Sequence, residues 1–365
     1  EKVTHPDPFD IVLIAANPQG GIWAVNRRDE ETRVETFDGA RFQTVISSSN
    51  PGDIDPNLRH LYASGHGGFW FAGLEGLVHY RDGQFHWFGP DESYTDTAAN
   101  CICPIDENRI WVGGRDAILE WNGAAWRTIR AGLDGVRSIR MGQDGSIWVA
   151  SGSGLHRCQD GSWVTITYED GLPNAAVFEV YVDRQNRIWA GTTRGLSLYH
   201  PEADRDPPQT YIPREMNSNR MVLGEVKFFF QGMDMWKYTR AGRLLYSWRV
   251  DDGPWQPFTP DTVAQVPVAK AGRHRFAARA MDRNWNVDPT PAVYSFTVVL
   301  PWYREPLFLA LSGLGMVLLG VSLAAHFSYH RNLGWLVAER TRELTHANQH
   351  LLQDAKQIKT AYEKV

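Results

Sequence analysis

The longest uninterrupted hydrophobic stretch of the chain lies near its C-terminal end, at residues 307–327. It contains no Lys, Arg, Asp or Glu. At a rise of 1.5 Å per residue, a helix of this length extends about 31 Å, which matches the hydrocarbon core of a bilayer. Trp302 and Tyr303 precede the stretch and Tyr329 follows it, as is typical of aromatic rings at a membrane interface. The pattern therefore predicts a transmembrane helix. The alternative is a buried helix of a large soluble domain, which is usually shorter.

Basic residues flank this stretch unequally. Within about fifteen residues, the N-terminal side carries only Arg304, whereas the C-terminal side carries Arg331, Arg340 and Arg342. Because basic residues concentrate on the cytoplasmic side of membrane proteins, residues 1–300 are predicted to lie outside and the tail inside. This arrangement is that of a single-pass receptor.

Residues 11–203 contain a repeat of about 40 residues. Its marker is a tryptophan, and spacings of 47, 41, 37 and 41 separate Trp23, Trp70, Trp111, Trp148 and Trp189. In four repeats an aliphatic residue follows seven positions later. In three of these an Asp-Gly or Asn-Gly pair, which favours a tight hairpin turn, comes after it. Each repeat is therefore predicted to form four short strands, which in the fourth repeat are 137–141, 146–150, 154–158 and 163–167.

A period near 40 with four strands in each repeat is typical of a β-propeller. We predict a partial propeller of about five four-stranded blades over residues 1–203, with the tryptophans packed between adjacent blades. The segments 144–155 (DGSIWVASGSGL) and 184–196 (RQNRIWAGTTRGL) resemble the two-component regulator propeller repeat. This resemblance implies the periplasmic sensor of a bacterial membrane histidine kinase. Such propellers usually have seven or more blades, so it also implies further blades before residue 1.

A second β domain is predicted after the repeats. Residues 204–214 are rich in Pro and Asp and are expected to form a linker, whereas residues 215–300 contain strands with alternating positions, as in 244–250. These features predict an immunoglobulin-like β-sandwich. The domain resembles the small sandwich that follows regulator propellers and is named for three tyrosines. Tyr246 matches one of them, and His274 stands where that family has another. A fibronectin-like spacer is the alternative.

After the hydrophobic stretch, residues 331–365 show a heptad pattern with d positions at Val337, Leu344, Leu351, Ile358 and Val365. Asn348 lies at an a position, where it favours a parallel, in-register dimer. We predict a cytoplasmic coiled-coil linker whose dimer seam consists of Val337, Leu344, Asn348, Leu351 and Ile358. Segment 339–352 resembles the helix that joins the last span of sensor kinases to their catalytic part. The alternative is a solitary amphipathic helix lying on the membrane.

A ring of side chains at one mouth of the propeller is the candidate ligand site. The positions eleven residues before four of the tryptophans hold Arg59, Asn100, Arg137 and Phe178. Loops before the innermost strands surround this mouth, where Arg and Asn can bind a carboxylate, a sulfate or sugar hydroxyls. The alternative is that these side chains cap strand ends. Loop 168–174 is a further candidate on the same face.

Composition limits the remaining chemistry. A net charge of −5 gives no basic surplus for binding nucleic acid. Cys101, Cys103 and Cys158 form neither a metal-ligand set nor an even disulfide framework, and we expect them to be small buried residues in strands. His346 and His350 fall at solvent-facing heptad positions without the sequence context of a phosphoacceptor. No catalytic, metal or cofactor site is therefore expected in this chain.

The order of propeller, sandwich, span and coiled coil predicts the ligand-sensing and signal-transmitting portion of a bacterial two-component sensor histidine kinase. We expect a cytoplasmic (inner) membrane location, with the N-terminal region periplasmic or extracellular. The expected partners are a small-molecule or oligosaccharide ligand outside, membrane lipid, a second copy of the chain, and a cytoplasmic response regulator reached through an output domain. The chain begins without Met and ends inside a helical pattern, so we expect a piece of a longer protein. The sensor portion of a diguanylate cyclase and a membrane-tethered propeller enzyme are the alternatives.

Overall fold

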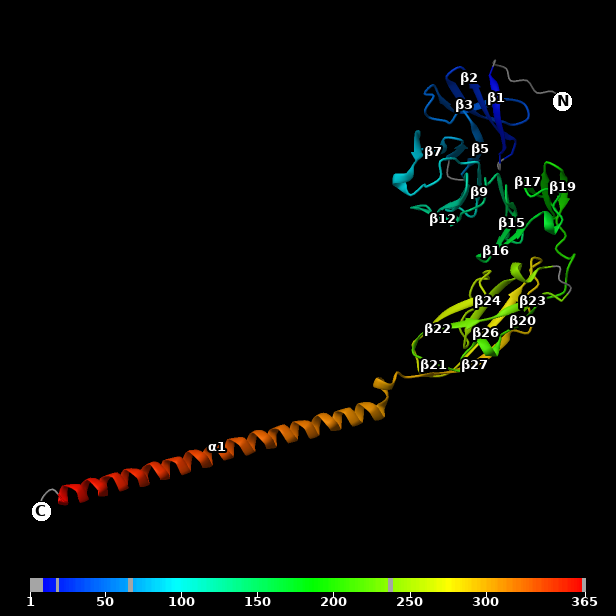
Figure 1. Ribbon diagram of the computed structural model, residues 1–365. Helices are drawn as coiled ribbons and strands as arrows, with labels where there is room; N and C mark the ends of the chain where they lie inside the picture. Colours follow the sequence, from blue (N-terminus) through cyan, green and yellow to red (C-terminus); the bar gives the residue numbers. More distant parts are fainter. Residues whose placement is uncertain (1–8, 18–19, 65–67, 236–238, 363–365) are drawn as a thin grey trace. The chain divides into compact units, whose positions relative to one another are not determined.

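The computed structural model describes residues 9–17, 20–64, 68–235 and 239–362, which form a mainly β structure followed by one long helix (Figure 1). The chain divides into two compact units that are treated separately below. The first consists of Glu1–Asn217, Lys227–Ala264 and Arg275–Tyr294, and the second of Ser218–Val226, Gln265–His274 and Ser295–Val365.

The first unit opens with four antiparallel, four-stranded sheets in which consecutive strands are hydrogen-bonded neighbours. These sheets are the predicted blades. Blade 1 contains β1 (Asp10–Ala16), β2 (Ile22–Arg28), β3 (Glu31–Phe37) and β4 (Phe42–Ser48). Blade 2 contains β5 (Leu58–Ala63), β6 (Phe69–Gly73), β7 (Gly76–Arg81) and β8 (Gln84–Phe88). Blade 3 contains β9 (Cys101–Pro104), β10 (Ile110–Gly113), β11 (Ile118–Trp121) and β12 (Trp126–Arg130). Blade 4 contains β13 (Ser138–Met141), β14 (Ile147–Ser151), β15 (Gly154–Gln159) and β16 (Ser162–Ile166).

The fifth repeat differs from the expected four strands. Blade 5 is a three-stranded sheet of β17 (Val177–Val182), β18 (Ile188–Thr192) and β19 (Gly195–Leu198). After β19 the chain enters a segment that contains Pro201, Pro207 and Pro208. Proline has no N–H to donate to a ladder, so this segment does not continue the sheet. The other four repeats match the prediction, with strands of blade 4 within one residue of the expected ends.

The repeat tryptophans occupy the second strand of every blade. Trp70 packs among side chains of blades 2 and 3, and Trp111 packs among those of blades 3 and 4. Trp148 lies between blades 4 and 5, and the ring of Trp23 lies edge-on to Phe69 of blade 2 at 5.0 Å. The predicted packing between blades is thus confirmed for four of the five tryptophans. Trp189 of blade 5 is only half-buried.

Two features of the repeat depend on glycine. Gly76, Gly154 and Gly195, which open the third strands of their blades, have φ between 137° and 141°, a conformation that side chains rarely adopt. A Cβ on Gly73 would lie 2.1 Å from Asp55 Oδ2, which accepts a hydrogen bond from the Glu75 amide at 2.6 Å. Glycine at that position therefore lets a loop carboxylate cap the neighbouring hairpin.

The predicted cysteine environment is confirmed. All three cysteines are free and buried, with Cys101 and Cys103 on β9 and Cys158 on β15. Burial raises the pKa of Cys101 to about 12, so the thiol is un-ionised at neutral pH.

The second β domain begins earlier than predicted. Its strands are β20 (Gln209–Tyr211), β21 (Arg220–Val222), β22 (Gly224–Phe229), β23 (Gln231–Met233), β24 (Leu245–Val250), β25 (Val263–Val268), β26 (Gly272–Met281) and β27 (Ala292–Val299). Strand β20 lies inside the predicted linker but belongs to the sandwich. It pairs with β23, and Thr210 Oγ1 accepts a hydrogen bond from the Ala280 amide at 2.7 Å.

Two layers of this sandwich enclose an aromatic core in the first unit. Phe228 of β22 stacks on Phe276 of β26 with ring centroids 4.2 Å apart. Phe230 lies 5.5 Å from the ring of Tyr246, the residue that matches the triple-tyrosine pattern. Strands β24 and β26 pair in antiparallel register, with Tyr246 opposite Ala280.

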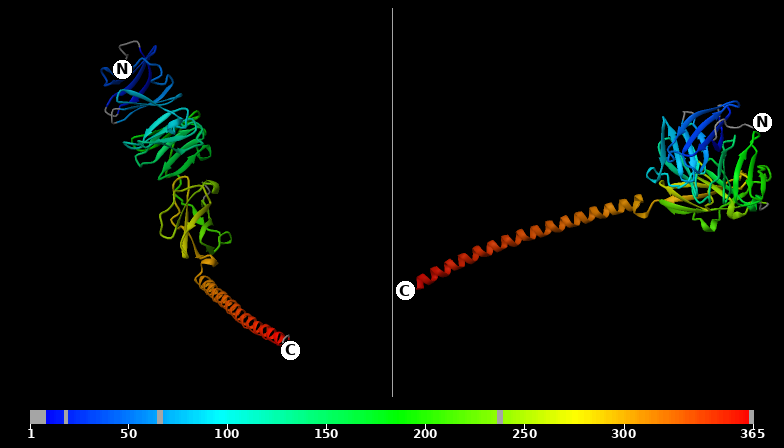
Figure 2. Two further views of the ribbon diagram at one scale, coloured as in Figure 1. Left: turned by 90° about the vertical axis from the view of Figure 1, so that its left-hand side faces the viewer. Right: turned by 90° about the horizontal axis from the view of Figure 1, so that it is seen from above.

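The second unit contains β21, which pairs in parallel with β27, and the ring of His274 stacked on Phe296 at 5.6 Å. It ends in α1 (Pro306–Tyr362), which is continuous through the predicted span and most of the predicted coiled-coil segment (Figure 2). Pro306 opens the helix as predicted. Its most apolar 18-residue window has a mean hydropathy of 2.2, so by length and composition it can cross a membrane.

The different burial of equivalent tryptophans gives a test of the propeller core. We expect Trp70→Ala to lower the free energy of unfolding by about 3–5 kcal/mol, because the ring is 4% exposed and fills the space between two blades. Trp189→Ala, at the same repeat position, should cost less than half as much. Denaturant titrations followed by circular dichroism would measure both, and equal losses would contradict the assigned packing.

Candidate functional site at the propeller–sandwich junction

Apolar side chains join blades 4 and 5 to the sandwich within the first unit. Leu245 of β24 and Met281 of β26 lie opposite each other and belong to the same buried cluster as Trp148 and Val180. The other faces of these two strands carry Tyr246 and Ala280, which are buried as well. Alternating sequence positions predict strands with one buried face. The structure buries both faces here because the blades cover the second one.

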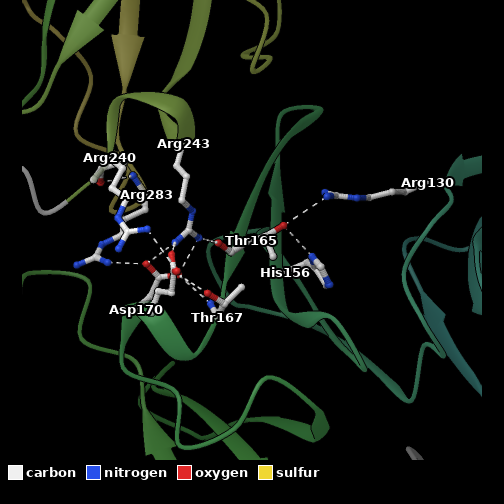
Figure 3. Close-up of polar contacts among 10 residues, drawn as sticks. Arg130, His156, Thr165, Thr167, Asp170, Arg240, Arg243 and Arg283 are labelled. Atoms are coloured by element: carbon white, nitrogen blue, oxygen red, sulfur yellow. Dashed lines mark hydrogen bonds and ion pairs between the residues drawn. The ribbon is translucent and has the colours of Figure 1, made fainter.

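A buried carboxylate lies beside this cluster (Figure 3). Asp170 ends the short 3-10 helix η2 (Tyr168–Asp170), and its Oδ2 accepts a hydrogen bond of 2.8 Å from the Thr167 amide at the start of that helix. Arg243 binds the carboxylate in bidentate fashion, with Nη1 2.8 Å from Oδ1 and Nη2 2.7 Å from Oδ2. Arg283 Nη1 donates to Oδ1 at 2.5 Å. Two sandwich arginines thus converge on one propeller side chain.

The electrostatics of this cluster favour the ionised carboxylate. Burial alone would raise the pKa of Asp170, whose side chain is 3% exposed. Hydrogen bonds from Arg243, the Thr167 amide and Arg283 outweigh that effect and lower the pKa below its ordinary value of 3.8. Bidentate pairing of this kind fixes orientation as well as distance. The junction is therefore held in one defined geometry at neutral pH.

A second polar chain continues from the same loop into blade 4 (Figure 3). The carbonyl oxygen of Thr165 accepts a hydrogen bond from Arg243 Nη2 at 2.6 Å, and its Oγ1 lies 3.3 Å from Arg130 Nη2 and 2.9 Å from His156 Nδ1. His156 Nε2 lies 2.8 Å from Ser151 Oγ. Burial, with Arg130 nearby, lowers the pKa of His156 to about 3, so the imidazole is neutral.

This serine–histidine pair is not arranged as a catalytic triad. The ring nitrogen that an orienting carboxylate would occupy instead contacts the hydroxyl of Thr165. His156 is buried among three hydroxyl side chains, those of Ser151, Ser153 and Thr165, which satisfy both of its nitrogens. Its role in the described structure is to connect strands of blade 4.

Comparison with known families identifies the segment that follows Asp170. The family model described as "Two component regulator propeller" matches residues 171–194. The matched segment starts directly after the buried carboxylate and runs through β17 and β18, including Trp189.

Several solved structures are similar to this chain at low sequence identity. The extracellular domain of the hybrid two component system BT3049 from B. thetaiotaomicron is 14% identical, with a TM-score of 0.49 over 80% of this chain and 44% of that one. The extracellular domain of BT4673 from the same organism is 14% identical, with a TM-score of 0.40 over 79% and 43%. PorZ of Porphyromonas gingivalis is 13% identical, with a TM-score of 0.42 over 79% and 45%. The chain thus spans less than half of each of these structures. No curated protein sequence matches it.

The four predicted ring residues differ in their contacts and in their exposure. Asn100 Nδ2 donates to the carbonyl oxygens of Gly114 and Val136, at 3.0 and 2.9 Å. Arg137 Nη1 donates to the carbonyl oxygen of Val177 at 3.2 Å, and its guanidinium lies 4.4 Å from the ring centroid of Phe178. The ring thus brings Arg137 and Phe178 together, while Asn100 and Arg137 make the backbone contacts expected of strand-end caps. Arg59 lies on β5 and is exposed.

The predicted seam residues lie on α1. Val337, Leu344, Leu351 and Ile358 are between 60% and 66% exposed in the single chain, and Asn348 is also exposed. Val365 lies outside the described residues. The helical conformation that the heptads require is present, and the dimer seam itself stays a prediction.

Sequence reasoning singled out loop 168–174 but not its key side chain. Asp170 precedes a glycine, as the turn aspartates of other repeats do, so turn chemistry explained it adequately. Its arginine partners lie 73 and 113 residues away, and no sequence spacing connects them. The local signal was Thr167, three residues before Asp170. This spacing is that of a capping box at the start of a helix, in which each of the two side chains hydrogen-bonds to the backbone of the other residue.

Removing the buried charge tests the junction. We expect Asp170→Asn to lower the free energy of unfolding by about 3 kcal/mol, because it leaves Arg243 and Arg283 without their shared counter-ion. The matched change Glu169→Gln should cost less than about 1 kcal/mol, because its nearer partner Arg240, at 3.4 Å, is 75% exposed and Arg243 lies farther away, at 3.8 Å. Thermal and denaturant unfolding would compare the two, and equal losses would show that Asp170 has no special role.

The buried imidazole predicts a pH dependence. His156 has a folded pKa of about 3 and an ordinary value of 6.5, so the unfolded chain binds the extra proton between these limits. Stability should therefore fall as pH decreases through 6.5. In His156→Gln, the slope of the unfolding free energy against pH should be smaller by about 1.4 kcal/mol per pH unit between pH 6 and 4. Burial raises the pKa of Asp282 to about 6, so this carboxyl contributes a pH slope of opposite sign. That contribution is the same in both proteins and cancels in their difference. Identical slopes would contradict a neutral buried His156.

Proposed function

We propose that this chain is the extracytoplasmic sensing and signal-transmitting portion of a bacterial two-component sensor histidine kinase. The observation that carries the proposal is the connection between a regulator propeller repeat and the sandwich through Asp170. The same chain continues into a helix that is long and apolar enough to cross a membrane. The similar structures of BT3049 and BT4673 are extracellular domains of two-component or one-component systems, which is compatible with this role.

In this proposal the propeller and the sandwich change conformation together. A ligand shifts such an equilibrium only by its differential affinity for the two states. A rigid salt-bridged junction supports transmission, because movement of the loop 168–170 requires Arg243 and Arg283 to follow or to lose their pairing. The ligand is a small molecule or an oligosaccharide, and the ring that includes Arg137 and Phe178 is one candidate contact surface.

The membrane location is also part of the proposal. The basic residues after the apolar segment, including Arg331 and Arg340, favour a cytoplasmic C-terminus in the inner membrane, with the β domains outside. Because α1 continues without interruption from Pro306 to Tyr362, a rotation or shift at the outer end of the helix would reach its cytoplasmic part. An output domain outside this sequence would then act on a cytoplasmic response regulator.

Two copies of the chain are proposed to meet along the heptad seam. The d-position side chains are apolar and exposed in the single chain, and burying them against a second helix is favourable. Asn348 at an a position would pair with its counterpart and align the two helices in register.

Disulfide cross-linking tests the dimer in the membrane. We expect Leu351→Cys, at a d position, to form a cross-linked dimer on mild oxidation of membranes that contain the full chain. The matched change Gln353→Cys lies on the outer face of the same turn and should cross-link far less. The three native cysteines are buried and provide a low background. Equal cross-linking at both positions, or none at Leu351→Cys, would contradict the seam.

A further inference from the structure

A groove of about 400 Å³ lies at the junction, beside the salt-bridged cluster. Its walls come from β12, β16 and the sandwich segment around Phe258. The residues that define its chemistry are Arg130, Trp163, Thr165, Arg243, Phe258 and Arg283. Among the described residues, its lining contains three arginines and no Asp or Glu. The groove is therefore electropositive with partly apolar walls.

Arg130 is the side chain in this groove whose charge is least satisfied. Its guanidinium lies 4.7 Å from the ring centroid of Trp163, and its Nη2 donates to Thr165 Oγ1 at 3.3 Å. Its Nη1 is buried and has no hydrogen-bond partner within the described structure. Desolvation lowers the pKa of Arg130, and no Asp or Glu among the described residues contributes an opposing effect. An unpartnered buried donor on a cation is costly, so the position favours an anionic acceptor.

The neighbouring acids do not fill this role. Asp170 accepts from Arg243, Arg283 and the Thr167 amide, and Glu169 lies near Arg240 and Arg243. The cluster thus has four guanidinium groups, including Arg130, against two carboxylates, an excess of two positive charges. His156, which shares Thr165 with Arg130, is neutral and does not change that balance.

We propose that this groove binds a small oxyanion, namely the carboxylate, sulfate or phosphate group of a ligand, with Arg130 as its principal contact. The planar guanidinium can donate two hydrogen bonds to such a group, and Arg243, which also lines the groove, adds positive potential. The apolar side chains of Trp163 and Phe258 lower the local dielectric constant and strengthen the attraction. Binding here would place an anion between blade 4 and the sandwich. This inference rests on the proposed sensor function: the groove would be a second sensing site, and its ligands would carry an oxyanion group.

Thermal unfolding of the full chain in detergent micelles tests the groove. Sodium sulfate, sodium phosphate and sodium acetate would be titrated separately, each against sodium chloride at equal ionic strength, to distinguish the three oxyanion classes. We expect at least one of them to raise Tm saturably by about 2–4 °C beyond chloride. Arg130→Gln should abolish this shift. Arg28→Gln, which removes an equally charged but 54% exposed side chain of β2, should retain it. A shift unchanged in Arg130→Gln, or no saturable shift with any oxyanion, would overturn the proposal.

A second variant covers the case in which Arg130→Gln does not fold. Arg130→Lys keeps the charge but loses the planar pair of donors, so the affinity for the oxyanion that stabilises the parent should fall at least about tenfold. Isothermal titration calorimetry would measure it, and an unchanged affinity would contradict the assignment. Loss of the anion site leaves the seam cross-linking unaffected, so failure of this inference is distinguishable from failure of the sensor proposal.

Discussion

The pairing of one buried carboxylate with two arginines determines how the propeller repeats connect to the sandwich. Asp170 is buried, and a carboxylate in that environment is stable only when its charge is compensated. Arg243 and Arg283 supply that compensation from two separate loops of the sandwich. Such a pair adds little net stability relative to an apolar contact, but it penalises any arrangement that separates its members. We interpret its role as specifying one junction geometry.

The surrounding packing makes that specification effective. The tryptophans of blades 1–3 pack against side chains of the next blade, with Trp23 only partly buried, so neighbouring blades share apolar clusters. Trp148 is covered by blade 5, and the same cluster continues to Leu245 and Met281 of the sandwich. Apolar burial supplies the favourable free energy, whereas the directional hydrogen bonds of the ion cluster fix the orientation of the groups that they join. The two kinds of interaction lie side by side because η2 follows directly after β16.

Much of the fold was predictable because it repeats. The Trp spacing predicted the blades, the glycines with positive φ explain the third strands, and an uncharged segment marked the helix that begins at Pro306. The strand count of blade 5 was wrong because prolines, rather than the repeat pattern, decide where the sheet ends. Strand β20 was assigned to a linker because its surroundings are rich in Pro and Asp, and its three residues are too few to show a period.

The junction site was harder to predict. Its contacts join residues that are distant in the sequence, and each member has an ordinary local explanation: Asp170 in a turn, Arg243 at the end of η4 (Ala241–Arg243) and Arg283 in a loop. By contrast, Arg137 and Phe178, two members of the predicted ring, lie together because equivalent positions of consecutive blades are close in a propeller. Repeats make such neighbours predictable, and a single long-range ion cluster is not.

In the proposed mechanism, the Asp170 junction is coupled to α1, the helix that is long and apolar enough to cross a membrane. The most direct measurement compares the rate of disulfide formation by Leu351→Cys in membranes, with and without Asp170→Asn in the same chain. If the junction sets the state of the paired helices, the rate changes when Asp170 is neutralised, while Glu169→Gln leaves it unaltered. Identical rates in all three proteins, with Asp170→Asn still folded, would contradict the claim.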